Sequence, residues 1–279
     1  MKNIVRLLRP HQWLKNLMLL FPPFLAGKIG GFSWFELVAP LASFSLLSSS
    51  SYIFNDILDV AADRCHPRKR LRPVAAGVVS VAAARLLALL LATAAFALAA
   101  WLVPEILPWL LIYALLALLY TLFFKHVAVV DIVAIAAFFL IRLLAGGAAF
   151  HVHVSGWLFG SVLLLALFLS VGKRLGELAA LGDVAVRHRS SLRCYTRPML
   201  LRLLYVCAVT VLFTYAMYCV SHGMLLSSVP LCALGLWRYI RRVRQGCDGD
   251  PTASLLRDPV LFVVGAVWLV LVSLAVYAG

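Results

Sequence analysis

Charged side chains are scarce in this sequence, and acidic ones most of all. Its 279 residues include 11 Asp and Glu against 25 Lys and Arg, and charged residues total 13%, about half the share found in soluble domains. Hydrophobic residues make up 64% and the mean hydropathy is +1.00, which together exclude a water-soluble globular fold. The composition predicts an integral membrane protein.

Cysteine is also sparse, and its spacing excludes two further classes. The six cysteines form no CxxC motif and at least three fall in apolar stretches, so the sequence predicts neither a zinc site nor a disulfide framework. The basic and then apolar N-terminus has no convincing small-residue cleavage site, which favours a retained first helix over a signal peptide.

Long apolar runs, by contrast, recur along the whole chain. Residues 1–13 alternate basic and apolar groups and suit a short segment in the headgroup layer. Most later runs approach the ~20 residues that a spanning helix needs, although Pro22 and Pro23 must kink the first. We expect an all-α polytopic membrane protein, a single domain 1–279 with nine transmembrane helices. The runs lie at 14–31, 34–57, 83–103, 106–124, 127–149, 156–180, 199–221, 224–240 and 259–278.

The basic residues fix the expected orientation. With the N-terminus inside, all but two of the 25 Lys and Arg belong to inner segments, the exceptions being Lys28 in an outer loop and Arg142 within a span. This placement accounts for the net charge of +14 without nucleic acid as a partner. Only Glu36 and Glu105 of the acids lie outside, so the inner face is expected to be the working face and the C-terminus to lie outside.

The stretch 55–73, NDILDVAADRCHPRKRLRP, contains the densest polar cluster. Asp56, Asp59 and Asp63 are spaced i, i+3 and i+7, which places them in one narrow arc of a helix with Asn55 beside them. Such a face of hard oxygen ligands suits Mg²⁺, which completes its octahedron with waters and substrate phosphates. We predict that these four residues bind the metal.

A run of cations follows, in which Lys69, Arg70 and Arg72 can bind the remainder of a polyphosphate. The alternative is a solvated loop whose basic residues only set topology. Topology depends on Lys and Arg, however, and has no need of three aligned aspartates.

A second polar site is predicted at the end of the sixth run, in VGKRLGELAALGD. Lys173 and Glu177 are spaced i, i+4, and Asp183 follows six residues later. A structural ion pair explains the first two equally well. The interpretation we favour is that inner loops at about 58–82 and 173–198 face each other across a central cavity and form the active-site face.

Further candidates lie at the edges of the spans. Tyr120 and Lys125 end the fourth run, with interface anchoring as the alternative role. Arg142 lies deeper, where a charge must be paired or line a wet cavity, so it is a functional candidate. Lys15 sits at the inner membrane edge.

These motifs resemble the UbiA superfamily of intramembrane prenyltransferases over nearly the whole chain. The resemblance rests on the span count, on the NDxxDxxxD pattern at 55–63 and on the second charged loop. Aromatic prenyltransferases of that superfamily carry a second DxxxD motif, whereas this loop reads GKRLGEL. Together with RPHQWLKN at 9–16, DRCHPRKRLRP at 63–73 and FFLIRLLAGGAA at 138–149, the departure resembles the branch of decaprenyl-phosphate phosphoribosyltransferases.

The resemblance implies a helical bundle around a central cavity in the inner (plasma) membrane, with a cytoplasmic active site. Mg²⁺ would hold the diphosphate of phosphoribosyl pyrophosphate on the catalytic residues Asp56, Asp59 and Asp63. A polyprenyl phosphate would be the acceptor, near Lys15, and the product would feed arabinofuranose donors for cell-wall polymers such as arabinogalactan. A donor with a 5-phosphate at one end and a diphosphate at the other needs more cations than a prenyl diphosphate, and the candidates for them are Lys69, Arg70, Arg72, Lys125, Arg142 and Lys173.

Two alternatives remain open at this point. The same fold could use a polyprenyl diphosphate donor and an aromatic or other small acceptor, which the GKRLGEL loop argues against. A transporter or channel would place charge near the middle of the membrane, whereas the three aspartates gather at one face. The sequence leaves open the polyprenyl chain length, the number of metal ions and whether the protein forms a homo-oligomer.

Overall fold

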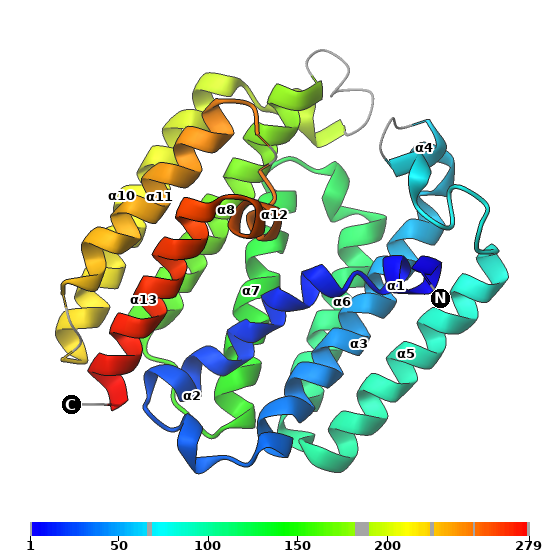
Figure 1. Cartoon of the computed structure of the whole chain (residues 1–279). Coiled ribbons are helices and arrows are strands. Elements are labelled where there is room, and N and C mark those ends of the chain that lie inside the picture. The colour runs from blue at the N-terminus through cyan, green and yellow to red at the C-terminus, as the bar shows by residue number, and fades with distance from the viewer. Residues whose placement is uncertain (1, 66–68, 182–189, 224–225, 248, 278–279) are drawn as a thin grey trace. The chain divides into compact units, whose positions relative to one another are not determined.

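The computed structural model describes residues 2–65, 69–181, 190–223, 226–247 and 249–277, and within these ranges it is all-helical. The elements, shown in Figure 1, are α1 (Lys2–Leu8), η1 (Pro10–Leu20), α2 (Phe21–Leu25), η2 (Ile29–Gly31), α3 (Trp34–Leu58), α4 (Val60–Arg64), η3 (Lys69–Leu71), α5 (Val81–Leu102), η4 (Pro104–Ile106), α6 (Leu107–Leu122), η5 (Phe124–His126), α7 (Val130–Ala149), α8 (Gly156–Leu181), η7 (Ser190–Cys194), α10 (Arg197–Ser221), α11 (Ser228–Arg244), α12 (Pro251–Arg257) and α13 (Pro259–Tyr277).

Seven of these helices are long and apolar enough to cross a membrane. They correspond to α3, α5, η4 with α6, α7, most of α8, α10 and α13. The predicted count of nine is not confirmed, because two predicted runs differ from the expectation. The first becomes the 3₁₀ helix η1 followed by the five-residue α2, and α11 has only 17 residues and ends in a basic turn.

The chain divides into two compact units. Unit 1 comprises Met1–Pro23, Lys28–Phe124 and Ile141–Val152, and unit 2 comprises Phe24–Gly27, Lys125–Leu140 and His153–Gly279. The division falls inside α7, so the units are not consecutive stretches of sequence. A single domain 1–279 stays a prediction.

Unit 1 is built around α3, which lies beside α5 (Figure 1). Ser33 caps the start of α3 in a capping box with Glu36, so the backbone amides of these two residues find side-chain acceptors. Ser50 in the middle of α3 donates a hydrogen bond to the carbonyl of Ala88 on α5 at 2.7 Å. Small polar residues therefore allow the two helices a close approach, as is common between membrane helices.

The small residues of α7 serve a similar purpose inside unit 1. A Cβ atom on Gly146 would lie 2.1 Å from the carbonyl oxygen of Leu19 in η1, a distance that no side chain can occupy. The AGGAA stretch thus lets η1 pack directly on α7. This contact positions the N-terminal segment for the site described below.

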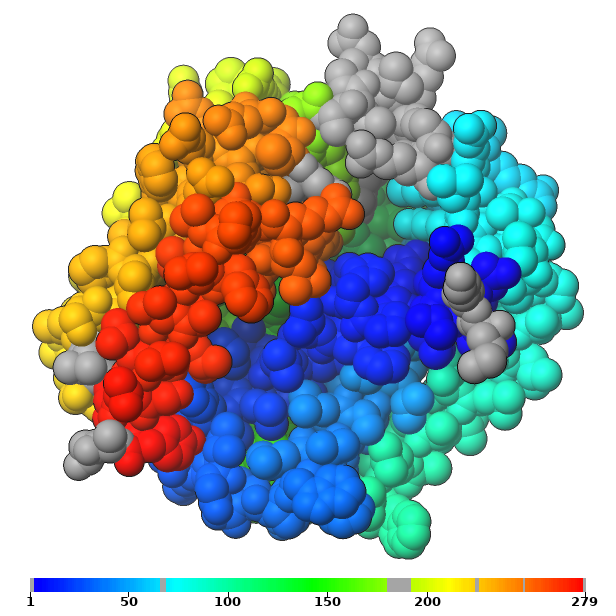
Figure 2. Space-filling model, viewed as in Figure 1, coloured from blue at the N-terminus to red at the C-terminus, as the bar shows by residue number. Residues whose placement is uncertain are grey.

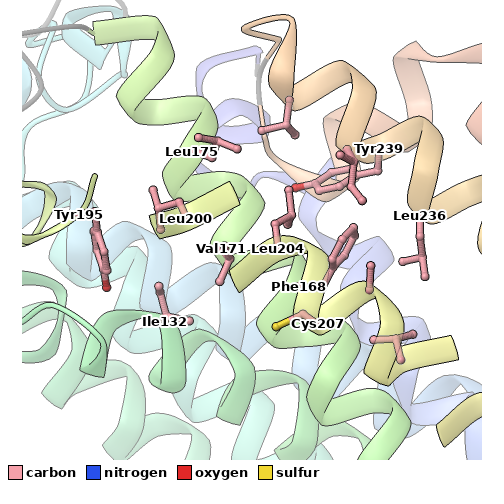
Figure 3. Packing of buried hydrophobic residues seen from close by; sticks show 14 of the residues in the cluster. Ile132, Phe168, Val171, Leu175, Tyr195, Leu200, Leu204, Cys207, Leu236 and Tyr239 are labelled. Atoms are coloured by element: carbon pink, nitrogen blue, oxygen red, sulfur yellow. The ribbon is translucent and has the colours of Figure 1, made fainter. Parts of the chain in front are cut away.

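Unit 2 has its own apolar core between α8, α10 and α11. Phe168, Val171 and Leu175 of α8 pack among Leu200 and other buried residues of α10 and α11 (Figure 3). Thr196 caps α10, with Pro198 in its first turn, where the missing amide proton costs nothing. These contacts hold the end of α8, with its charged residues, in a packed environment.

Candidate active site

Two aspartates of unit 1 converge on one arginine. Asp56 lies in the last turn of α3 and Asp63 in α4, and both side chains are almost fully buried, at 2% and 3% exposure. Nη1 of Arg72 donates to Oδ1 of Asp56 at 3.0 Å and to Oδ2 of Asp63 at 2.6 Å. Two of the three carboxylates predicted to bind metal therefore already share a positive charge.

A second arginine, Arg9, reaches the same cluster from the N-terminal segment. Its Nη2 donates to Oδ1 of Asp56 at 2.5 Å, and its guanidinium lies 5.2 Å from the ring centroid of Tyr52. The backbone of Arg9 has φ 53°, the left-handed region that a residue with a side chain rarely adopts. A strained residue held by a buried carboxylate is a candidate for function.

The other half of the predicted metal set lies at the break between α3 and α4. Asp59 follows the last residue of α3, and its Oδ2 accepts a hydrogen bond from Nδ2 of Asn55 at 3.0 Å. Within the described ranges no group of three or more His, Cys, Asp and Glu side chains is gathered for a metal. Arg72 bridges Asp56 and Asp63, and the metal role of the four residues stays a prediction.

The donor chemistry of this cluster fits a divalent cation. Burial raises the pKa of Asp63 above its ordinary value, although Arg72 opposes the shift. Burial disfavours the charged form of a carboxylate, and any cation beside it stabilises that form. Asp56 and Asp63 offer the hard oxygen atoms that such a cation prefers. Their shared partner, the Arg72 guanidinium, shows that a positive group fits between them.

The remaining predicted cations of this loop are less buried. Lys69 and Arg70 lie in η3, where Lys69 is half-buried and Arg70 is exposed. The charge of Lys69 contributes to lowering the pKa of Asp63, against the larger effect of burial. Lys69 thus belongs to the surroundings of the carboxylate cluster, whereas Arg70 is placed only as its exposed neighbour in η3.

Arg142 is buried inside unit 1 with neutral partners. Its Nε donates to Oδ1 of Asn16 at 2.7 Å, and its Nη2 donates to the hydroxyl of Tyr113 at 3.1 Å. The guanidinium also lies 4.8 Å from the Tyr113 ring centroid. The intramembrane charge is therefore stabilised by an amide, a hydroxyl and an aromatic face. Asn16 itself donates to Ser45 on α3 at 2.9 Å.

Unit 2 contains a buried ion pair that sequence reasoning missed. Nε of Arg174 lies 2.9 Å from Oδ2 of Asp131, and both side chains have 0% exposure. Arg174 also binds the half-buried Glu177, three residues along α8. The alternative structural ion pair considered for Glu177 was with Lys173, and the structure shows such a pair with the adjacent Arg174.

A tyrosine completes this network. The hydroxyl of Tyr195 donates to Oδ1 of Asp131 at 2.8 Å and accepts from the amide of Val129 at 2.6 Å. Burial raises the pKa of Tyr195 to about 12, so the hydroxyl stays protonated and remains a donor to the carboxylate. Val129 has φ 67°, a strained conformation for a β-branched residue. Its amide is thereby directed at the tyrosine.

The other predicted site residues fall into both units. In unit 1, Lys15 lies half-buried in η1 next to Asn16, and Tyr120 lies half-buried near the end of α6. In unit 2, Lys125 lies in η5 and Lys173 is half-buried on α8. Asp183 lies outside the residues that the structure describes.

These features define an integral membrane protein of helical architecture, with a buried acid–arginine cluster at the end of a spanning helix and a buried ion-pair network at the end of another. Residues 17–263 match the UbiA prenyltransferase family. The chain belongs to this family.

The relatives and the solved structures extend along the whole chain. The decaprenyl-phosphate phosphoribosyltransferase of Mycobacterium tuberculosis (strain CDC 1551 / Oshkosh) is 33% identical over 290 residues, covering 99% of this chain and 95% of that protein. The enzyme of the same name from Mycolicibacterium smegmatis is 32% identical, covering 99% and 92%. Among solved structures, a UbiA homolog from Archaeoglobus fulgidus bound to DMAPP and Mg²⁺ has a TM-score of 0.76 at 20% identity, covering 98% of each chain.

Proposed function

We propose that the protein transfers the 5-phosphoribosyl group of phosphoribosyl pyrophosphate to a polyprenyl phosphate, with decaprenyl phosphate as the acceptor, and releases diphosphate in a Mg²⁺-dependent reaction. The observation that carries the proposal is the likeness, at 33% identity over 99% of the chain, to an enzyme named for this reaction. The product would serve in the synthesis of arabinan precursors for the cell wall.

The reaction needs little proton chemistry from the protein. An oxygen of the anionic lipid phosphate attacks C1 of the ribose, and the bond from C1 to the diphosphate oxygen breaks, so that the diphosphate leaves with the electron pair. Because the nucleophile is already charged, no general base is required. The protein must instead bind the two anions and stabilise the charge that develops on the leaving group.

The carboxylate cluster of unit 1 is the proposed site for the diphosphate. Asp56 and Asp63, with Asn55 and Asp59, would hold Mg²⁺, which supplies a Lewis acid for the leaving diphosphate. Arg72 donates hydrogen bonds to both carboxylates, and it would donate to diphosphate oxygens in their place when the donor binds. Arg9 would hold the Asp56 carboxylate in its orientation.

The assay that tests the function supplies the purified protein with labelled phosphoribosyl pyrophosphate, decaprenyl phosphate and Mg²⁺. We expect labelled lipid and free diphosphate in equal amounts. A parallel reaction contains a polyprenyl diphosphate and aromatic acceptors. Prenylation of an aromatic acceptor, with phosphoribosyl pyrophosphate left unused, would overturn the proposal in favour of a prenyltransferase with a prenyl diphosphate donor.

Lys173 is the residue we assign to the remote 5-phosphate of the donor, which metal on the diphosphate cannot reach. A charge-assisted contact is worth roughly 1.5 to 3 kcal/mol. Lys173→Ala should therefore weaken the use of phosphoribosyl pyrophosphate by about ten- to a hundredfold and leave the affinity for the lipid acceptor unchanged. Steady-state kinetics with each substrate varied in turn measures both. An equal loss for the two substrates would contradict the assignment.

We further propose that all nine predicted runs cross the plasma membrane. At about 2.0 Å per residue, the 11 residues of η1 extend about 22 Å, and α2 adds about 7 Å, which approaches the ~30 Å hydrocarbon thickness. The 17 residues of α11 extend about 25 Å, and its arginines lie toward one end, where they can reach the headgroups.

The orientation can be tested with native cysteines. Cys65 after α4 and Cys194 in η7 are both exposed, whereas Cys207 and Cys219 are buried. If the working face is cytoplasmic, a membrane-impermeant maleimide should label the first two only after the membrane is opened. Cys65→Ser and Cys194→Ser variants assign the label. Labelling of either residue in intact cells would contradict the proposed orientation.

A further inference from the structure

The arginines of α11 fall on two faces with different partners. Arg238 and Arg242 are spaced i, i+4 and both bind Asp258, with Nη–Oδ2 distances of 2.9 and 2.8 Å. Asp258 is buried, and although burial opposes it, the hydrogen bonds from Arg238 and Arg242 and from the amide of Leu261 hold its pKa well below the usual range. The charge on this face is therefore partly neutralised within the fold.

The other face carries Arg241 and Arg244. Among the described residues, neither has a carboxylate within ion-pairing distance, and the same is true of Arg197 at the start of α10. Arg197 donates to the carbonyl of Arg244 at 3.2 Å, and Arg244 donates to the hydroxyl of Tyr205 at 3.1 Å. Three exposed guanidinium groups thus gather at one end of the α10–α11 pair.

These arginines stand at the end of a groove between α10 and α11, which lie side by side in Figure 1 and at the surface in Figure 2. The groove has a volume of about 630 Å³. Beyond the basic end its walls are apolar, formed largely by Ala208, Val209, Leu212, Ala233, Leu236 and Ile240. No acidic residue is among the described residues that line it.

The length of the groove matches one leaflet of a bilayer. From Arg197 to Leu212 the rise of an α-helix gives about 22 Å, and one leaflet measures about 15 Å for its hydrocarbon half and about 20 to 22 Å with its headgroup layer. The basic end lies where the positive-inside distribution places the inner face. An apolar slot with cations at the headgroup level has the charge pattern of an anionic lipid with its tail toward the membrane centre.

We propose that this groove binds one anionic phospholipid of the inner leaflet, whose phosphate contacts Arg197, Arg241 and Arg244 and whose acyl chain lies against the apolar walls. Guanidinium groups bind phosphate oxygens through paired N–H donors, which fixes a headgroup more firmly than a diffuse surface charge does. Trp237, beneath the guanidinium of Arg241 at 5.6 Å, adds an aromatic surface at the level of the headgroup.

The lipid site is separate from the candidate active site in sequence and in role. None of its lining residues belongs to the carboxylate cluster of unit 1 or to the Asp131–Arg174 network. The proposal therefore does not depend on which group the enzyme transfers, and its test does not use activity.

The test is native mass spectrometry of the full chain released from nanodiscs that contain equal amounts of phosphatidylglycerol and phosphatidylcholine. We expect the wild type to retain phosphatidylglycerol in preference. The double variant Arg241→Gln/Arg244→Gln should retain at least about tenfold less, since each basic residue near the surface contributes to the attraction. The control Arg85→Gln/Arg257→Gln removes the same charge from two exposed positions outside the groove and should match the wild type.

A variant that fills the slot without changing charge tests the place of the acyl chain. Val209→Trp, at an exposed position of the groove wall, should lower lipid retention although all three arginines remain. Equal retention of the two lipids by the wild type would overturn the proposal, and this measurement needs no variant. Equal losses in the test and control variants, or full retention by Val209→Trp, would also overturn it. A dimer that only the groove variants disrupt would overturn it as well, because the occupant would then be a second copy of the chain.

Discussion

Asp63→Asn should reduce phosphoribosyl transfer by roughly a thousandfold, the upper range for the loss of one group that stabilises transition-state charge. Asp63 shares Arg72 with Asp56, and its carboxylate is almost fully buried, so no water-exposed acid can replace it. The amide keeps the shape and one oxygen acceptor but removes the negative charge that a divalent cation requires. Turnover measured across a Mg²⁺ titration should show activity that added metal does not restore.

Folding must be separated from chemistry in this experiment. Among the residues that the structure describes, removing Asp63 leaves Arg72 with one carboxylate partner, Asp56, so some loss of stability is expected as well. Size-exclusion behaviour and thermal unfolding of the purified variant measure that part. Glu105→Gln, at an exposed position of the predicted outer side, is the matched control for the loss of one acid and should keep full turnover. Wild-type turnover in folded Asp63→Asn would remove the metal assignment.

The helices were predictable where hydrophobic runs and caps agree. The run at 34–57 became α3, Trp34–Leu58, because Ser33 and Glu36 mark its start and the polar sequence at 55–63 its end. The first run could not be read in the same way. Pro22 and Pro23 lack amide protons, and the chain before them forms a 3₁₀ helix, a distinction that hydropathy does not carry.

The candidate site was predictable in its acids but not in their partners. The i, i+7 spacing brings Asp56 and Asp63 to one side, yet Arg9, which binds Asp56, lies 47 residues earlier in the chain. Its only local signals were the Arg–Pro sequence and a basic N-terminus. Arg9 directly precedes η1, and η1 is placed by its packing on α7 at Gly146. Hydrophobic periodicity does not reveal a contact of this kind.

Neighbouring cations on α8 show the same limit at the scale of one residue. Lys173 and Arg174 are adjacent, and the sequence favoured the lysine because of its i, i+4 spacing to Glu177. In the structure Arg174 is fully buried and Lys173 is half-buried. Because α8 is apolar on all sides, its sequence does not show which of the two side chains faces the interior. Arg174 is the buried one because it pairs with Asp131 of α7.

Breaking the Asp131–Arg174 pair should be the most destabilising change in unit 2. Both side chains have 0% exposure, so Arg174→Met leaves the buried Asp131 carboxylate without the arginine charge, although the Tyr195 hydroxyl still donates to it. Loss of one member of a buried ion pair typically costs about 3 to 5 kcal/mol. We expect a decrease of that size in the free energy of unfolding, measured by SDS titration in mixed micelles. Arg193→Met, at an exposed arginine of η7, should change it by less than about 0.5 kcal/mol.

The double variant Asp131→Asn/Arg174→Met separates the ion pair from the packing of its members. Asparagine at 131 keeps an oxygen that can accept from Tyr195, and methionine fills part of the volume of Arg174 without its charge. Removing both charges together avoids the penalty of an unpaired buried ion, so the double variant should lose at least about 1 kcal/mol less than the sum of the single variants. Strict additivity would show that the two charges do not stabilise each other, and the end of α8 would then be held by its apolar contacts alone.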